Sequence, residues 1–101
     1  METEVHHGDG VERSPALEQY IEARLERLRP QYGDRLTRVR AFLKDVNGQK
    51  GGVDKSCKLE ARPAGKDPIV VEAQDADWYA AVRDAEGKLE RALAHRLLPD
   101  H

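Results

Sequence analysis

The sequence predicts a small α+β domain, a two-layer sandwich of element order β-α-β-β-β-α in which both helices cover one face of a four-stranded sheet. Three observations support this prediction. Two segments carry apolar residues at three- and four-residue intervals, three segments carry them at every second position, and the connections between those three are short. Because 101 residues is the length of one typical domain, we expect residues 1–101 to form a single domain.

The first part of the chain is predicted to form a strand and a helix. Residues 3–7 are expected to be a short strand that ends at a glycine-rich turn. Ser14 can cap the following helix with its side-chain oxygen, and Pro15 suits the first helical position. Pro30 and Gly33 are expected to end that helix. Its apolar stripe consists of Leu17, Tyr20, Ile21, Leu25 and Leu28.

The middle of the chain changes to a period of two, which is typical of half-buried strands. Strands are predicted at 36–44, 55–62 and 69–73, joined by a glycine-rich hairpin loop at 47–54 and a turn at 63–68. Since each strand has one apolar and one polar face, both helices should cover the apolar side and leave the other open. The apolar positions include Val39, Ala41, Leu43, Cys57, Leu59 and Ala61.

The last segment is predicted to be a second amphipathic helix. Asp75 or Asp77 is expected to cap its first turn, and Pro99 is expected to end it. The residues that recur at three- and four-residue intervals along it are Trp78, Ala81, Val82, Ala85, Leu89, Ala92, Leu93 and Arg96.

The sequence contains little that indicates catalysis or metal binding. Cys57, the single cysteine, occupies an apolar mid-strand position, which favours a buried small hydrophobe over a nucleophile. His6 and His7 are adjacent on a strand and point to opposite faces, so with Asp9 they do not predict a metal site. No phosphate-cradling or nucleophile motif occurs. We therefore expect no enzyme activity, no metal or other cofactor, and no small-molecule substrate.

Three further features favour a cytoplasmic protein. No apolar run approaches the roughly 18 residues of a membrane span, and the first residues resemble no signal peptide. A lone cysteine cannot form an internal disulfide, which agrees with a reducing compartment.

The formal net charge of −2 argues against nucleic-acid binding only until its distribution is considered. Residues 1–30 have a net charge of −3 and residues 67–101 one of −4. Residues 31–66, with nine basic and four acidic side chains, have a net charge of +5. What a partner meets therefore depends on the fold rather than on the total.

Basic residues gather at two places on the predicted fold. The open sheet face should carry a ladder, interrupted by Glu60, that consists of Arg38, Arg40, Lys44, Lys58 and Arg62. The two helices should bring a second set into one groove: Arg24, Arg27, Lys88, Arg91, His95 and Arg96. Arginine and lysine bind nucleic-acid phosphates through charge-assisted hydrogen bonds and counterion release. The alternative interpretation is an ordinary solvated surface.

Two stretches of the chain carry a family resemblance. Residues 75–93, DADWYAAVRDAEGKLERAL, match a pattern of an acidic residue, Tyr-Ala-Ala and then Lys-Leu-x-Arg at Asp77, Tyr79, Ala80, Ala81, Lys88, Leu89, Arg91 and Leu93. Residues 14–28 match a Thr-Pro-Ala-Leu-x-x-Tyr pattern in type at Ser14, Pro15, Ala16, Leu17, Tyr20, Arg24 and Leu25. The chain thereby resembles the short, single-domain type of the ribosome hibernation-promoting factor and ribosome-associated translation inhibitor family.

The resemblance implies a factor that binds the small ribosomal subunit, between head and body, and blocks translation reversibly during stress or stationary phase. It implies ribosomal RNA contacts first for Arg24, Arg27, Lys88 and Arg91, and next for His95 and Arg96. The sequence departs from the family pattern at Arg83, where an acidic residue is usual, and at Gly87. Residues 97–101 replace a lysine-rich tail.

The leading hypothesis is thus a non-enzymatic, monomeric factor whose partner is the small ribosomal subunit and its RNA. An alternative is a stress-linked protein-interaction domain of the same fold that does not bind ribosomes, which the acidic net charge favours. A third interpretation, a double-stranded RNA binder, lacks the Lys-Lys cluster that such domains place at the start of their last helix.

Overall fold

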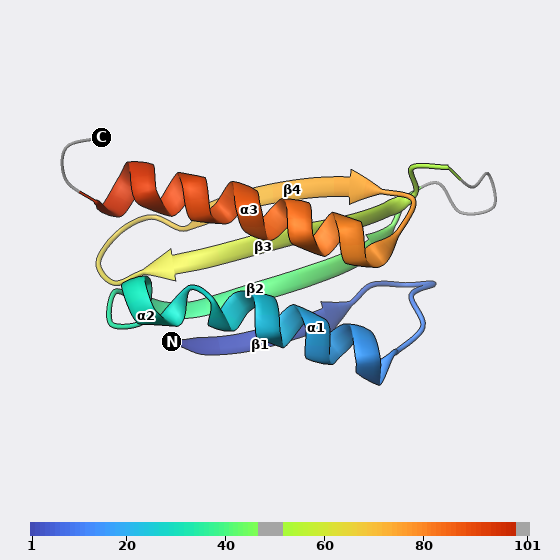
Figure 1. Cartoon of the computed structure of the whole chain (residues 1–101), viewed down its shortest axis with the longest axis horizontal. Coiled ribbons are helices and arrows are strands. Elements are labelled where there is room, and N and C mark those ends of the chain that lie inside the picture. The colour runs from blue at the N-terminus through green and yellow to red at the C-terminus, as the bar shows by residue number, and fades with distance from the viewer. Residues whose placement is uncertain (47–51, 99–101) are drawn as a thin grey trace.

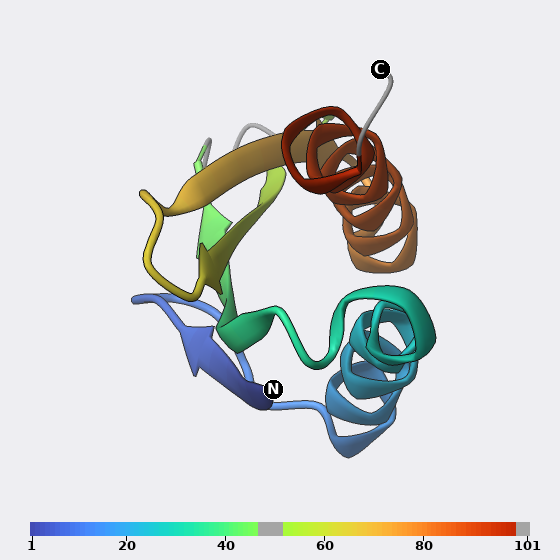
Figure 2. The same ribbon diagram turned by 90° about the vertical axis from the view of Figure 1, so that its left-hand side faces the viewer.

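The computed structural model describes residues 1–46 and 52–98 and has the predicted α+β architecture. The helices lie side by side on one face of the sheet, and no described element covers the other face, here called the open face (Figures 1 and 2). The predicted loop at 47–54 lies partly, and Pro99 wholly, outside the described residues. The elements are β1 (Glu2–His7), α1 (Pro15–Glu26), α2 (Arg29–Tyr32), β2 (Leu36–Asp45), β3 (Lys55–Pro63), β4 (Ile69–Asp75) and α3 (Trp78–Leu97).

The four strands lie in the order β1-β2-β3-β4. The later three form an antiparallel meander, as their short connections favour, whereas β1 runs parallel to β2. A parallel pair requires a crossover connection, and α1 with α2 provides it on the face of the sheet that the helices cover. The register places His6 beside Phe42 and Phe42 beside Lys58, so side chains from three strands form one row across the open face.

The core lies between the sheet and the helices, where the alternation predicted it. Strands β2, β3 and β4 alternate between buried residues facing the helices and more exposed residues on the open face, except that Ser56 on the open side of β3 is also buried. Burying each large aliphatic side chain stabilises the fold by about 1.5–3 kcal/mol. Side chains with no exposed surface include Ile21, Leu25, Val39, Ala41, Leu59, Ala61, Leu89 and Leu93.

The prediction that the first helix ends at Pro30 was wrong. α1 ends at Glu26, and Pro30 lies in the first turn of the separate short helix α2. Proline is tolerated there because the first backbone N–H groups of a helix have no intrahelical partner. The extra turn brings Tyr32 into the core, and Gly33 ends α2 as the C-cap residue.

Both predicted helix caps are present. The Ser14 hydroxyl oxygen accepts a hydrogen bond from the Leu17 N–H at 3.2 Å, and Pro15 follows it at the start of α1. Of the two candidates for α3, Asp77 is the N-cap, because its Oδ2 accepts from the Ala80 N–H at 3.2 Å. These caps fix the residue at which each helix begins, and hence which of its residues face outward.

Candidate nucleic-acid interface

Two of the predicted contact residues, Arg24 and Arg27 of α1, face carboxylates of α3. Arg24 Nη2 donates to Glu86 Oε1 at 2.6 Å, and Arg27 Nε lies 3.8 Å from the same oxygen. Arg27 Nη2 also lies 3.9 Å from Glu90 Oε2. The Arg24 side chain is 20% exposed and that of Arg27 is 56% exposed. Arg24 therefore joins the two helices, while Arg27 remains accessible at the surface.

Glu86 is the central residue of this cluster, and sequence analysis did not single it out. Its side chain has no exposed surface. The available signal was its spacing, four residues after Val82 and three before Leu89, which places it on the buried stripe of α3. Burial, and next a hydrogen bond and the negative charge of Glu90, raise the pKa of Glu86 to about 7 against the opposing effect of Arg24. This carboxyl therefore changes its protonation near neutral pH.

A hollow of about 510 Å³ lies beside the cluster and is called here the helix-face hollow. Arg24 borders it from α1, and Arg83, Lys88 and Arg91 border it from α3. Lys88 Nζ donates to the Glu72 carbonyl oxygen at 2.8 Å, and its side chain remains exposed. Arg91 is exposed and has no ion-pair partner within residues 1–46 and 52–98. Three of the predicted basic residues therefore meet at one concave surface.

The remaining basic residues of α3 lie around or beyond this hollow. Arg83, noted in the sequence only as a departure from a family pattern, has its Nε 3.5 Å from Asp84 Oδ1. Asp84 also borders the hollow, so the lining is not uniformly basic. His95 and Arg96 are exposed in the last turn of α3 and do not line the hollow. They extend the basic edge of the helix toward its C-terminus.

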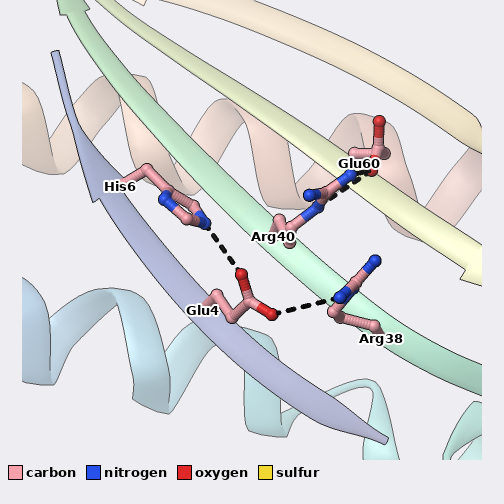
Figure 3. Close-up of polar contacts among 5 residues, drawn as sticks. All are labelled: Glu4, His6, Arg38, Arg40 and Glu60. Carbon is pink, nitrogen blue, oxygen red and sulfur yellow. Dashed lines mark hydrogen bonds and ion pairs between the residues drawn. The ribbon is translucent and has the colours of Figure 1, made fainter.

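The open face carries the second predicted set, and carboxylates neutralise its inner arginines (Figure 3). Arg38 Nη1 lies 3.4 Å from Glu4 Oε2, and Glu4 also pairs with His6 at 2.8 Å. Arg40 binds Glu60 through Nε, at 3.0 Å, and through Nη2. The hydrogen bond from His6 lowers the pKa of Glu4, and that from Arg40 lowers the pKa of Glu60. Both carboxylates are therefore charged at neutral pH.

The outer cations of the open face are not neutralised in this way. Lys44, Lys58 and Arg62 are exposed, and the described part of the chain offers none of them an ion pair. Glu60 interrupts the ladder as predicted, but it does so by binding Arg40 rather than by standing alone. The charge available to a partner on this face is therefore that of two lysines and one arginine.

The sequence features considered for catalysis and metal binding are the single cysteine and the histidine and acidic side chains. Cys57 is buried, and burial, followed by the negative charge of Glu72, raises the pKa of its thiol to about 12, so no thiolate nucleophile forms near neutral pH. Within the same residues, no three histidine, cysteine, aspartate or glutamate side chains are grouped to hold a metal ion. Nor does any described helix have the length and apolar character needed to cross a membrane.

Comparison with solved structures shows the same fold in two other proteins. A ribosomal subunit interface protein from Coxiella burnetii superposes with a TM-score of 0.79 at 25% identity, covering 94% of this chain and 96% of that one. The N-terminal domain of Thermus thermophilus Protein Y superposes with a TM-score of 0.74 at 25% identity, covering 94% of this chain and 98% of that one. No curated protein sequence matches the chain.

The sequence itself matches a family model over residues 5–97, which is nearly the whole chain. That model describes the Sigma 54 modulation protein / S30EA ribosomal protein family, and the match includes both α1 and α3, which carry the quoted motifs. It confirms the resemblance to ribosome hibernation factors, and the chain belongs to the Sigma 54 modulation protein / S30EA ribosomal protein family.

Proposed function

We propose that this chain binds ribosomal RNA of the small ribosomal subunit and reversibly inhibits translation during stress or stationary phase. It would act as a single, monomeric cytoplasmic domain without enzyme activity. The observation that carries the proposal is the family match over residues 5–97, supported by structural likeness to a protein named as a ribosomal subunit interface protein. The cations around the helix-face hollow supply the matching chemistry.

Within this proposal the basic residues of the two helices have different roles. Lys88 and Arg91, both exposed at the helix-face hollow, bind RNA phosphates directly through charge-assisted hydrogen bonds. Arg24 sets the position of α1 against α3 through Glu86, and Arg27, which does not line the hollow, adds an exposed positive charge on α1. His95 and Arg96, in the last turn of α3, lengthen the basic edge of this helix.

Inhibition of translation requires no chemistry from the protein. The described domain measures 44 × 25 × 19 Å, which is large enough to exclude another macromolecule from the surface it occupies. Because binding rests on ionic contacts, its affinity should fall as salt rises, and translation should resume when the factor dissociates. The net charge of −2 is consistent with weak rather than salt-resistant association.

The experiment is co-sedimentation with purified small ribosomal subunits across a salt series, joined to a translation assay. The double variant Lys88→Glu with Arg91→Glu should bind at least about 10-fold more weakly and inhibit translation less. Two lost phosphate contacts should also reduce the slope of log affinity against log salt by about 2. The matched control is Arg13→Glu with Lys66→Glu, because it makes the same change in net charge at exposed positions away from the hollow.

Two outcomes would contradict the proposal. If wild-type protein remains at the top of the gradient at low salt, the chain does not bind the small subunit, and a pull-down that recovers a protein without ribosomal RNA would favour the interaction-domain alternative. If both double variants lose binding equally, the effect follows net charge alone, and Lys88 and Arg91 are not contact residues.

A further inference from the structure

The open face carries an aromatic ring that is not part of the hydrophobic core. Phe42, the only phenylalanine of the chain, is half-buried on β2 and belongs neither to the core nor to the apolar residues packed against it. Its neighbours in the row across the sheet are His6 of β1 and Lys58 of β3. The Phe42 ring therefore lies between two strands that carry basic side chains, on a face that the helices do not cover (Figure 2), and its surroundings are what suggest a role for it.

The groups around this ring form an aromatic platform with attached cations. The His6 ring stacks on Phe42 with 4.9 Å between ring centroids and 12° between ring planes. Lys58 Nζ lies 5.1 Å and Arg40 Cζ 5.5 Å from the Phe42 centroid, within the range of cation–π attraction. His6 is fixed in turn by Glu4, 2.8 Å from its Nε2. The platform is thus ordered before any ligand arrives.

A second hollow, of about 470 Å³, lies beside the platform and is called here the sheet-face hollow. His6, Phe42 and Lys44 line it, so two aromatic rings and one cation face the same space. Asp9 and Asp45 also line it, which disfavours an anionic group deep inside. An uncharged, flat group inside the hollow, joined to anionic groups outside it, fits this distribution of charge.

The exposed cations lie where those anionic groups would run. Lys58 projects from β3 on one side of Phe42, and Lys44 lies two residues further along β2. Arg62 extends the line along β3. Because Arg38 and Arg40 are neutralised by Glu4 and Glu60, these three side chains carry the charge that a phosphate chain would meet.

We propose that the open face is a second RNA site, which takes single-stranded RNA by seating an unpaired base against the Phe42–His6 platform while Lys44, Lys58 and Arg62 bind its phosphates. Unpaired bases stack on exposed aromatic side chains, and the adjoining phosphates bind basic side chains, whereas a duplex hides its base faces. An acidic peptide would form ion pairs with the cations, but it would not stack on the rings of Phe42 and His6. The site is separate from the helix-face hollow and does not depend on ribosome binding.

The test is fluorescence anisotropy of a labelled ten-nucleotide single-stranded RNA titrated with the full chain at low salt. Phe42→Leu keeps an apolar side chain but removes the stacking ring, and it should weaken binding on the order of 10-fold. Lys58→Gln should weaken binding several-fold and reduce the salt slope by about 1. The matched control is Tyr79→Leu, which removes an exposed aromatic ring from the helix layer and should leave binding unchanged.

Competition distinguishes the possible occupants of the open face. Unlabelled single strands should displace the probe, whereas an RNA duplex of the same sequence or a polyglutamate peptide should displace it at least about 10-fold less well. Equal competition by the duplex or the peptide would overturn the proposal. So would Phe42→Leu binding as tightly as wild type, since this variant should keep the fold: its ring lies outside the core, and an unchanged thermal midpoint would confirm this.

The proposal of an RNA site on the open face and the proposal of ribosome binding can be refuted independently of each other. Lys88→Glu with Arg91→Glu should weaken small-subunit binding yet retain most oligonucleotide binding, and Phe42→Leu should weaken oligonucleotide binding. If the helix-face variant alone abolishes oligonucleotide binding, the open face is not the single-strand site.

Discussion

The helix face and the open face both present arginines beside carboxylates, but the carboxylates differ in burial. Glu86, which holds Arg24, has no exposed surface. Glu60 is 20% exposed and Glu4 is 35% exposed, and both lie where water reaches them. The same pair of residue types therefore has different roles: between the helices it is a structural contact, and on the sheet it adjusts surface charge.

The difference also separates the cations that are available to a partner from those that are not. On the helix face Arg91 and Lys88 are exposed while Arg24 is mostly covered. On the open face Lys58 and Arg62 are exposed while Arg40 is bound to Glu60. In both layers the inner guanidinium group organises the surface and the outer cation meets the solvent.

The largest effect expected from this comparison is on stability. Arg24→Ala removes the main partner of a buried carboxylate, and it should lower the free energy of unfolding at pH 8 by about 3 kcal/mol or more. Arg40→Ala breaks a partly exposed pair and should cost about 1 kcal/mol or less. Urea unfolding followed by circular dichroism measures both.

A double variant shows whether the loss comes from the unpaired charge. Arg24→Met with Glu86→Leu replaces the pair with apolar side chains and should recover most of the stability that Arg24→Ala loses. Equal losses for Arg24→Ala and Arg40→Ala would mean that burial of Glu86 does not distinguish the two faces.

The second prediction concerns pH and again depends on Glu86. Its pKa is raised from the ordinary value of 4.5 to about 7, so the folded state binds the proton more tightly than the unfolded state does. The proton on Glu86 adds stability to the folded state. This contribution is complete below about pH 4.5 and is lost as the pH rises through about 7. The loss should be about 2–3 kcal/mol for a shift of this size.

Thermal unfolding between pH 5 and pH 8 tests this prediction, with Glu86→Gln as the variant that cannot titrate. The wild-type midpoint should fall across this interval while that of the variant stays nearly level. The open-face carboxylates do not obscure the result, because the pKa values of Glu4 and Glu60 are lowered and these groups titrate below the interval. Parallel profiles for the two proteins would assign the pH dependence to another group.

Periodicity accounts for what could be predicted of this fold. The alternation at Val39, Ala41 and Leu43 and the stripe through Ile21 and Leu25 depend only on local spacing, and the structure buries all five side chains as expected. The basic residues on both faces followed from the same spacing. Local patterns therefore predicted which face each residue occupies.

The features that could not be predicted from the sequence depend on contacts between residues that are far apart in the chain. The platform of His6 and Phe42 depends on the parallel register of β1 with β2, and a shift of one residue would turn His6 toward the core. Burial of Glu86 depends on Arg24 lying opposite it on another helix, and charge alone predicts an exposed glutamate. Pro30 was misplaced because proline suits the start of a helix as well as its end.

The smallest expected effect tests how closely a partner approaches the helix-face hollow. Gly87 lies inside α3 and borders this hollow, and a Cβ added there would meet only the Arg91 Nη1 atom, at 3.6 Å. Since glycine weakens a helix interior by about 0.8–1 kcal/mol relative to alanine, Gly87→Ala should raise the free energy of unfolding by up to that amount. If phosphates contact only the ends of Lys88 and Arg91, the added methyl group should leave small-subunit binding unchanged. Weaker binding by a more stable variant would instead show that RNA approaches the helix backbone itself, and would extend the contact surface from the side chains to the floor of the hollow.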